Sequence, residues 1–185
     1  PLLNWPVLKF IVKYAKEVNK EKNKNLSISL VSNLTLLDDK KLKFLLDEDV
    51  HLSCSFDGPE KVHNKNRIIL NKEKNSYKIV AGKIKKIQKA IKLKRTKSKN
   101  KFVDNLNAVL TVSKFSLSYH KEIIDEYIKM GFDNIFIRPL SPFGLERQTL
   151  NIIGYRLEEF IDFYKKSMDY ILKLNLEGKF FAERN

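Results

Sequence analysis

Ser55, Asp57 and Arg67 bring a hydroxyl, a carboxylate and a guanidinium into one short stretch of the sequence. An alternating apolar run, Val50 to Phe56, predicts a strand that ends at Asp57-Gly58-Pro59, and a polar loop is expected before Arg67. In β/α proteins, short polar side chains at the ends of strands converge on ligands. These three residues are therefore the first site candidates, although Asp-Gly-Pro is also an ordinary turn and a purely structural role stays open.

The composition of the chain is typical of a globular protein. Its 185 residues are 43% hydrophobic and 31% charged, which fits one domain or part of a larger protein. No apolar run approaches the roughly 18 residues that span a bilayer, and no signal-peptide pattern opens the sequence, so a cytoplasmic protein without membrane contact is expected. The single cysteine, Cys54, excludes an internal disulfide and cannot build a metal site alone. Its place in the apolar alternation predicts core packing.

The net charge of +14 raises the hypothesis of a nucleic-acid partner. Only six of the 36 basic residues are arginines, however, and the most concentrated block, Lys83 to Lys101, contains no aromatic residue and only Arg95. Within this block Ile84, Ile87 and Ile91 recur at helical spacing, which favours a helix with a solvated basic face followed by a basic loop. Binding of an acidic partner, peptide or nucleic acid, remains the alternative.

Strand and helix patterns alternate along the chain, which predicts an α/β fold with parallel strands and right-handed crossovers. We expect helices over residues 8–18, 39–46, 79–93, 120–130 and 157–174, and strands over residues 26–31, 50–56, 108–112 and 134–138. The carboxyl ends of these strands carry Ser32-Asn33, Ser55-Asp57-Gly58, Thr111–Ser113 and Arg138-Pro139, which should line one mouth. Four strands cannot close a barrel, so a partner strand is expected upstream of Pro1.

Several segments, in order, resemble the core of radical S-adenosylmethionine enzymes of the group that carries a cysteine-rich C-terminal SPASM extension. This group includes anaerobic sulfatase-maturing enzymes and other peptide maturases. Pro1-Leu-Leu-Asn4 is similar to the end of the family's Gly-Gly-Glu-Pro segment and its continuation, and Ser32-Asn33-Leu34-Thr35 to the Thr-Asn-Gly-Thr of its third strand. Ser55-Phe-Asp-Gly-Pro59 and then His63-Asn-Lys-Asn-Arg67 are similar to Ser-(Leu/Ile)-Asp-Gly-Pro and His-Asp-Lys-Asn-Arg of its fourth. The resemblance covers nearly the whole chain.

The resemblance implies roles for particular residues. Ser55 and Arg67 match the residues that hold the ribose and the carboxylate end of S-adenosylmethionine (AdoMet), chemistry that suits a hydroxyl and a planar cation. Ser32 and Asn33 match the strand end near the methionyl part, and Leu140 belongs to the stretch that packs on the adenine. Asp57 is a further candidate for the cofactor or a turn cap. Arg138 is a candidate for holding an acidic group of the peptide substrate or the cofactor, against a structural role in an ion pair. His63 is a candidate for contact with substrate, against a structural role in bridging the loop.

The departures from the family pattern are as informative. The Cys-x3-Cys-x2-Cys loop that binds the 4Fe-4S cluster has no counterpart in a chain with one cysteine. Leu34 replaces the third-strand glycine, which puts the conformation of that turn in doubt. We therefore expect residues 1–185 to form strands three to six of a partial TIM-like (β/α) barrel, with the cluster-binding part upstream and the SPASM region downstream. Such a fragment is predicted to be inactive alone and poorly soluble because of its open sheet edge.

The activity implied for the whole enzyme is reductive cleavage of AdoMet to a 5'-deoxyadenosyl radical that modifies a peptide or protein side chain. A flavodoxin or ferredoxin is the implied reductant. Residues 136–144 and 172–184 are more similar to maturases of His-Xaa-Ser peptide systems than to the sulfatase-maturing type. Two other classes stay open, namely a noncatalytic basic β/α module that binds nucleic acid or acidic peptide, and a different β/α enzyme with a phosphate site, although no glycine-rich phosphate loop is present.

Overall fold

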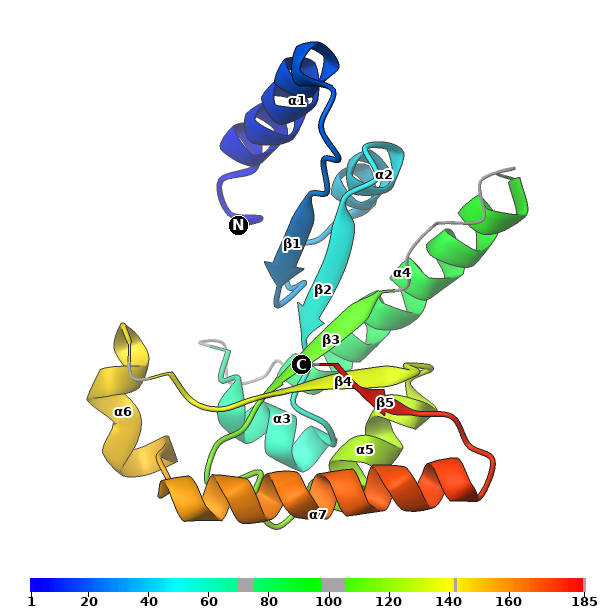
Figure 1. Cartoon of the computed structure of the whole chain (residues 1–185). Helices are drawn as coiled ribbons and strands as arrows, with labels where there is room; N and C mark the ends of the chain where they lie inside the picture. The colour runs from blue at the N-terminus through cyan, green and yellow to red at the C-terminus, as the bar shows by residue number, and fades with distance from the viewer. Residues whose placement is uncertain (70–74, 98–105, 142, 185) are drawn as a thin grey trace. The chain divides into compact units, whose positions relative to one another are not determined.

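The computed structural model describes residues 1–69, 75–97, 106–141 and 143–184 (Figure 1). The chain forms two compact units. The first consists of Pro1–Cys54 with Gly82–Leu106, and the second of Ser55–Ala81 with Asn107–Asn185. Ser55, the last residue of strand β2, therefore belongs to the second unit.

The described residues of the first unit form two parallel strands, two helices and most of a third. In chain order these are α1 (Trp5–Lys22), β1 (Ser29–Ser32), α2 (Asp39–Asp47), β2 (His51–Ser55) and most of α4 (Ser76–Lys97). Strands β1 and β2 pair from Ser29 opposite His51 to Ser32 opposite Cys54. Helix α2 begins where predicted, because the carboxylate of Asp38 accepts a hydrogen bond from the backbone N–H of Lys41 at 2.8 Å.

Helix α4 confirms the amphipathic pattern of its sequence. Ile84, Ile87 and Ile91 are buried, whereas Lys85 and Lys89 are exposed on the opposite face, as expected for a solvated basic face. The helix starts earlier and ends later than predicted, at Ser76 and Lys97. The remainder of the predicted basic block, residues 98–101, lies outside the described residues.

The second unit contains three parallel strands and their connecting helices. It comprises α3 (Glu60–Asn66), β3 (Asn107–Thr111), α5 (His120–Lys129), β4 (Asn134–Arg138), α6 (Leu145–Ile153), α7 (Leu157–Leu176) and β5 (Ala182–Glu183). Strand β4 pairs with β3 on one side and with β5 on the other. Figure 1 shows α5 and α7 together along one side of these strands. Gly131, with φ +81°, ends α5 in the left-handed conformation that the sequence predicted.

Three elements differ from the expectation. Residues 60–66 form helix α3 where a polar loop was predicted, and α6 and β5 were not predicted at all. Helix α3 has fewer than two full turns and buries only Val62 and His63, so its sequence carries no apolar period to recognise. Strand β5 has two residues, which is shorter than any pattern of alternation.

The structure confirms the predicted fold class of parallel, open α/β structure. Each pair of strands within a unit is parallel, and the alternation of strand and helix follows the predicted order. Among the described residues, no helix combines the length and the apolarity needed to span a membrane.

Candidate functional site

A cavity of about 960 Å³ lies in the second unit, at the carboxyl ends of its strands. Ser55 ends β2, Thr111 ends β3, and Leu140 follows β4, so three of the predicted strand ends contribute to one cavity. Its polar lining comprises Ser55, Asp57, Asn64, Lys65, Asn66, Arg67, Thr111 and Ser113. Its remaining lining residues are Ile68, Phe115, Leu140, Thr149, Ile152 and Ile153.

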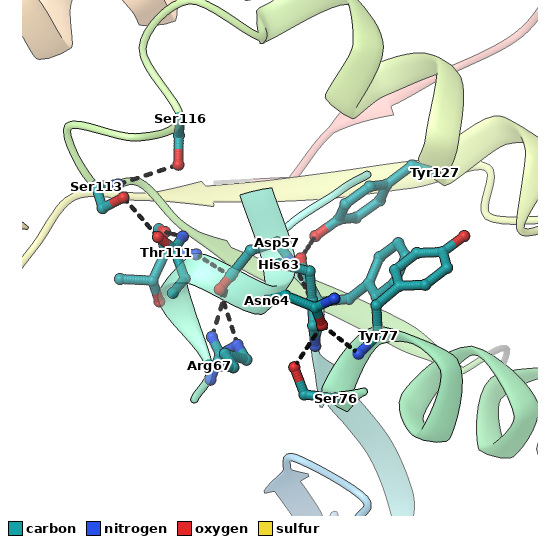
Figure 2. Close-up of polar contacts among 12 residues, drawn as sticks. Asp57, His63, Asn64, Arg67, Ser76, Tyr77, Thr111, Ser113, Ser116 and Tyr127 are labelled. Atoms are coloured by element: carbon teal, nitrogen blue, oxygen red, sulfur yellow. Dashed lines mark hydrogen bonds and ion pairs between the residues drawn. The ribbon is translucent and has the colours of Figure 1, made fainter. Parts of the chain in front are cut away.

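An ion pair between Asp57 and Arg67 lies at the centre of the polar lining (Figure 2). Arg67 Nε is 2.8 Å from Asp57 Oδ2, and Arg67 Nη2 donates a hydrogen bond to Asp57 Oδ1 at 3.1 Å. The backbone N–H of Thr111 also donates to Oδ1, at 3.1 Å. The side chain of Asp57 is 1% exposed and that of Arg67 is 26% exposed. The carboxylate is therefore buried and paired through both oxygens, whereas part of the Arg67 side chain, which lines the cavity, stays exposed.

Asn66 connects the end of α3 to the end of β3. Its Nδ2 donates to the carbonyl of Thr111 at 3.5 Å, and its Oδ1 accepts from the Ser113 hydroxyl at 2.7 Å. Ser113 in turn donates its backbone N–H to the Ser116 hydroxyl and accepts from the backbone N–H of Phe115. These bonds fix the two polar segments relative to one another, which is what a preformed binding site requires.

His63 is fully buried beneath the site, 0% exposed, and is not among the residues that line the cavity. Its Nδ1 accepts a hydrogen bond from the backbone N–H of Asp57 at 3.2 Å, so the proton of the neutral ring lies on Nε2, which has no hydrogen-bond partner among the described residues. Burial lowers the pKa of His63 to about 4, and the charge of Arg67 also lowers it while that of Asp57 opposes the shift. This geometry fits the structural role of bridging the loop, which was the predicted alternative to a contact with substrate.

Asn64 fixes the start of α4 to α3. Its side-chain oxygen accepts from the hydroxyl of Ser76 and the backbone N–H of Tyr77, each at 2.9 Å. The hydroxyl of Tyr77 donates to Glu126 on α5, and this contact together with burial raises the pKa of Tyr77. A hydrogen bond from Tyr127 to the carbonyl of Phe56 attaches α5 to the strand end (Figure 2).

Ser32 and Asn33 end β1 in the first unit, where both side chains bind the backbone of their own turn. Ser32 Oγ accepts from the N–H of Leu34 at 3.1 Å, and Asn33 Oδ1 accepts from the N–H of Thr35 at 3.3 Å. Leu34 has φ +60°, the left-handed conformation that favours glycine, and its side chain is 1% exposed. The turn therefore keeps the glycine-type conformation without the glycine.

Arg138 ends β4 and Leu140 lies two residues later, but only Leu140 lines the cavity. Arg138 is exposed, stands opposite Thr111 in the register of β3 and β4, and is not among the lining residues of the cavity. Leu140 lines the cavity, and its backbone N–H donates to the hydroxyl of Tyr155 at 2.8 Å.

Sequence reasoning missed several contributors to the site, namely Asn64, Lys65, Asn66, Ile68, Phe115 and helix α6. The first three lie on α3, so the expectation of a loop concealed which of them would face inward. The one available signal was the run of polar residues that directly precedes Arg67.

The residues of this chain do not fit an iron–sulfur cluster. Within the described ranges, no group of three or more His, Cys, Asp or Glu side chains could hold a metal ion. The sequence has one cysteine, whereas a 4Fe-4S cluster needs several thiolates. The cavity does fit a zwitterionic nucleoside ligand, because it offers a hydroxyl, a partly exposed guanidinium, an apolar leucine and sufficient volume.

No family model matches the sequence, and no curated protein matches it. Among solved structures, the chain is similar to anSMEcpe, an anaerobic sulfatase-maturing enzyme. The structure described as native anSMEcpe with bound AdoMet and Kp18Cys peptide has 22% sequence identity and a TM-score of 0.72 over 96% of this chain. Native anSMEcpe with bound AdoMet gives 21% identity and a TM-score of 0.72, again over 96% of this chain. The chain spans 46% and 45% of those two structures, which is about half of their length. The chain thus has the fold of part of this radical AdoMet enzyme.

Proposed function

We propose that this chain is part of a radical AdoMet enzyme that modifies a peptide or protein side chain, and that the cavity of the second unit binds AdoMet. The observation that carries the proposal is the partly exposed Arg67, which lines one cavity with Ser55 at a strand end of a fold shared with a structure that binds AdoMet.

Arg67 is the group we assign to the carboxylate of AdoMet. A guanidinium held in place by a buried partner recognises a carboxylate with little loss of side-chain entropy. Asp57 supplies that partner and so acts as a positioning residue, because both of its oxygens already contact Arg67. Ser55 is assigned to the ribose hydroxyls and Leu140 to the adenine, in keeping with their places in the lining.

Ser32 and Asn33 are the remaining cofactor candidates. Because their side chains satisfy the backbone of their own turn, we propose that they shape the end of β1. Their contact with AdoMet stays a prediction. Arg138 stays a candidate for an acidic group of the substrate, since it is exposed at the end of β4.

In the whole protein, the proposed reaction is reductive cleavage of AdoMet to a 5'-deoxyadenosyl radical that abstracts hydrogen from the substrate. The 4Fe-4S cluster would take its cysteine ligands from outside this chain, and a flavodoxin or ferredoxin would supply the electron. A peptide substrate is supported by the peptide bound in the anSMEcpe structure of the same fold. A cytoplasmic location and a His-Xaa-Ser type of substrate stay predictions.

The proposal is tested by equilibrium dialysis of the chain against labelled AdoMet. We expect Arg67→Ala to weaken binding by roughly tenfold or more, because a hydrogen bond to a charged group contributes about 1.5–3 kcal/mol. Ser55→Ala should weaken it by a smaller factor. Arg184→Ala removes an exposed arginine at the end of β5 and serves as the matched control. Equal affinity for AdoMet in the wild type and in Arg67→Ala would show that this cavity is not the AdoMet site.

A further inference from the structure

Part of the cavity lining is apolar and is not assigned to AdoMet. Ile68, Phe115, Ile152 and Ile153 form an apolar portion of the lining, and of these Ile68 and Ile152 are exposed, Ile152 by 54%. Single exposed apolar residues are common on proteins, but several that share one concave surface mark a place where an apolar group binds.

The apolar portion is fixed by bonds at the end of helix α6. The backbone N–H of Lys114 donates to the carbonyl of Ile153 at 2.9 Å, which attaches α6 to the segment after β3. The hydrogen bond from Leu140 to Tyr155 attaches the segment after α6 to the one after β4. Ile152 and Ile153 therefore lie at the carboxyl end of α6, where hydrogen bonds attach the chain to the segments that follow β3 and β4.

The charge beside these residues is positive. The Nζ of Lys65 lies 5.1 Å from the centre of the Phe115 ring, and Lys65 is exposed. The carboxylate in the lining, that of Asp57, is buried and paired with Arg67. Among the lining residues that the structure describes, a ligand at the apolar portion therefore meets an exposed lysine and no exposed carboxylate, which favours an anion next to an apolar group.

We propose that Ile68, Phe115, Ile152 and Ile153, with Lys65, form a subsite for an apolar side chain of the substrate peptide that has a carboxylate residue next to it. The inference rests on the proposed function, since it assigns the second ligand of the same cavity. The volume of about 960 Å³ lies at the upper end of the roughly 300–1,000 Å³ typical of ligand sites, which leaves space beside a bound cofactor.

The test uses three fluorescein-labelled Gly-Ser peptides with a central Asp-Leu, Asp-Ser or Lys-Leu pair, titrated into the full chain with and without AdoMet. The Asp-Leu peptide should bind roughly tenfold tighter than the Asp-Ser peptide, because burial of a leucine side chain supplies about that factor. Ile152→Asp should abolish the preference for leucine, and Lys65→Ala the preference for aspartate over lysine. Ile161→Asp and Lys165→Ala, exposed positions on α7, are the matched controls.

The outcomes separate this inference from the proposed function. Equal binding of the three peptides by the wild type, or equal effects of Ile152→Asp and Ile161→Asp, would overturn the subsite even where AdoMet binds normally. A peptide preference without any AdoMet binding would contradict the proposed cofactor and support the subsite. Since Ile152 is 54% exposed, we expect the Ile152→Asp variant to fold, and the wild-type peptide series decides the question without any variant.

Discussion

At the scale of single residues, the site depends on two buried polar side chains with different tasks. Asp57 is a charge that burial makes costly unless it is paired, and three hydrogen-bonding or ionic contacts offset that cost. His63 is neutral and accepts one backbone hydrogen bond from the same residue. Both side chains hold the turn that precedes α3, so their substitution should change stability in distinguishable ways.

Replacement of Asp57 by asparagine should lower the free energy of unfolding by about 2 kcal/mol, because Arg67 loses its buried partner while remaining partly solvated. Urea unfolding monitored by circular dichroism measures this loss. Asp162→Asn removes one partner of an exposed ion pair with Lys166 and should change stability by less than about 0.5 kcal/mol. Similar losses in the two variants would contradict the structural importance of the buried pair.

The depressed pKa of His63 predicts acid sensitivity. The unfolded chain binds a proton at His63 below about pH 6.5, whereas the folded protein does so only near pH 4. The stabilisation from keeping this ring neutral is therefore complete above pH 6.5 and is lost as the pH falls towards 4, by about 3 kcal/mol in total. Urea midpoints between pH 7 and pH 4 should fall more steeply for the wild type than for His63→Gln.

His120 provides the control for this titration. It is partly exposed, and burial together with neighbouring charges lowers its pKa. The His120→Gln variant should keep the steep pH dependence of the wild type. If His63→Gln loses as much stability between pH 7 and pH 4 as the wild type does, then other titratable groups cause the acid sensitivity.

At the scale of elements, the decisive feature is the turn that joins β2 to α3. Gly58 has φ +92°, and a Cβ there would lie 2.7 Å from Cγ1 and 3.1 Å from Cα of Ile123 on α5. The turn thus needs glycine for two reasons, its backbone conformation and the close approach of another helix. Asp57 lies directly before this glycine, and Arg67 directly follows the seven-residue helix α3. The two side chains form their ion pair across this helix.

Gly58→Ala should lower the free energy of unfolding by about 2–4 kcal/mol, from a left-handed backbone and from overpacking against α5. Gly82→Ala is the matched control, because Gly82 lies within α4 and a Cβ there meets nothing within 4 Å. That substitution should stabilise the protein by about 0.5–1 kcal/mol. Thermal melts of both variants measure the difference, and a neutral Gly58→Ala would show that the turn relaxes.

At the scale of the whole molecule, the net charge of +14 favours solubility, whereas exposed strand edges oppose it. Among the described residues of the first unit, β1 pairs with β2 alone, and Val31 on β1 is 52% exposed. An apolar residue on an unpaired edge promotes pairing between copies of a chain.

Val31→Lys should therefore reduce aggregation of the isolated chain, because an edge lysine opposes strand addition. Static light scattering as a function of protein concentration measures the change. Leu172→Lys, at an exposed position of α7, adds the same charge away from the strands and should have little effect. Equal improvement in both variants would show that net charge, and not the edge, controls solubility.

The sequence by itself determined the order of strands β1 to β4 and of helices α1, α2, α4, α5 and α7, because apolar period and turn residues are local signals. It did not reveal α3, α6 or β5. The sequence also determined Ser55, Asp57 and Arg67 as site candidates and Cys54 as a core residue, which is 0% exposed. The doubt about the turn at Leu34 was not confirmed, since the turn takes the left-handed conformation although leucine is poorly suited to it. These features depend on neighbouring residues along the chain.

Only the tertiary structure decided what those candidates do. The pairing of Asp57 with Arg67 exists because the chain between them is a helix, and a short helix with two buried residues has no pattern that sequence can reveal. The burial of His63 and the apolar portion contributed by α6 depend on segments far apart in the sequence. Contacts of that kind are set by packing, which local patterns do not encode. The sequence therefore located the candidate residues between Ser55 and Arg67, but it did not show which contacts each of them makes.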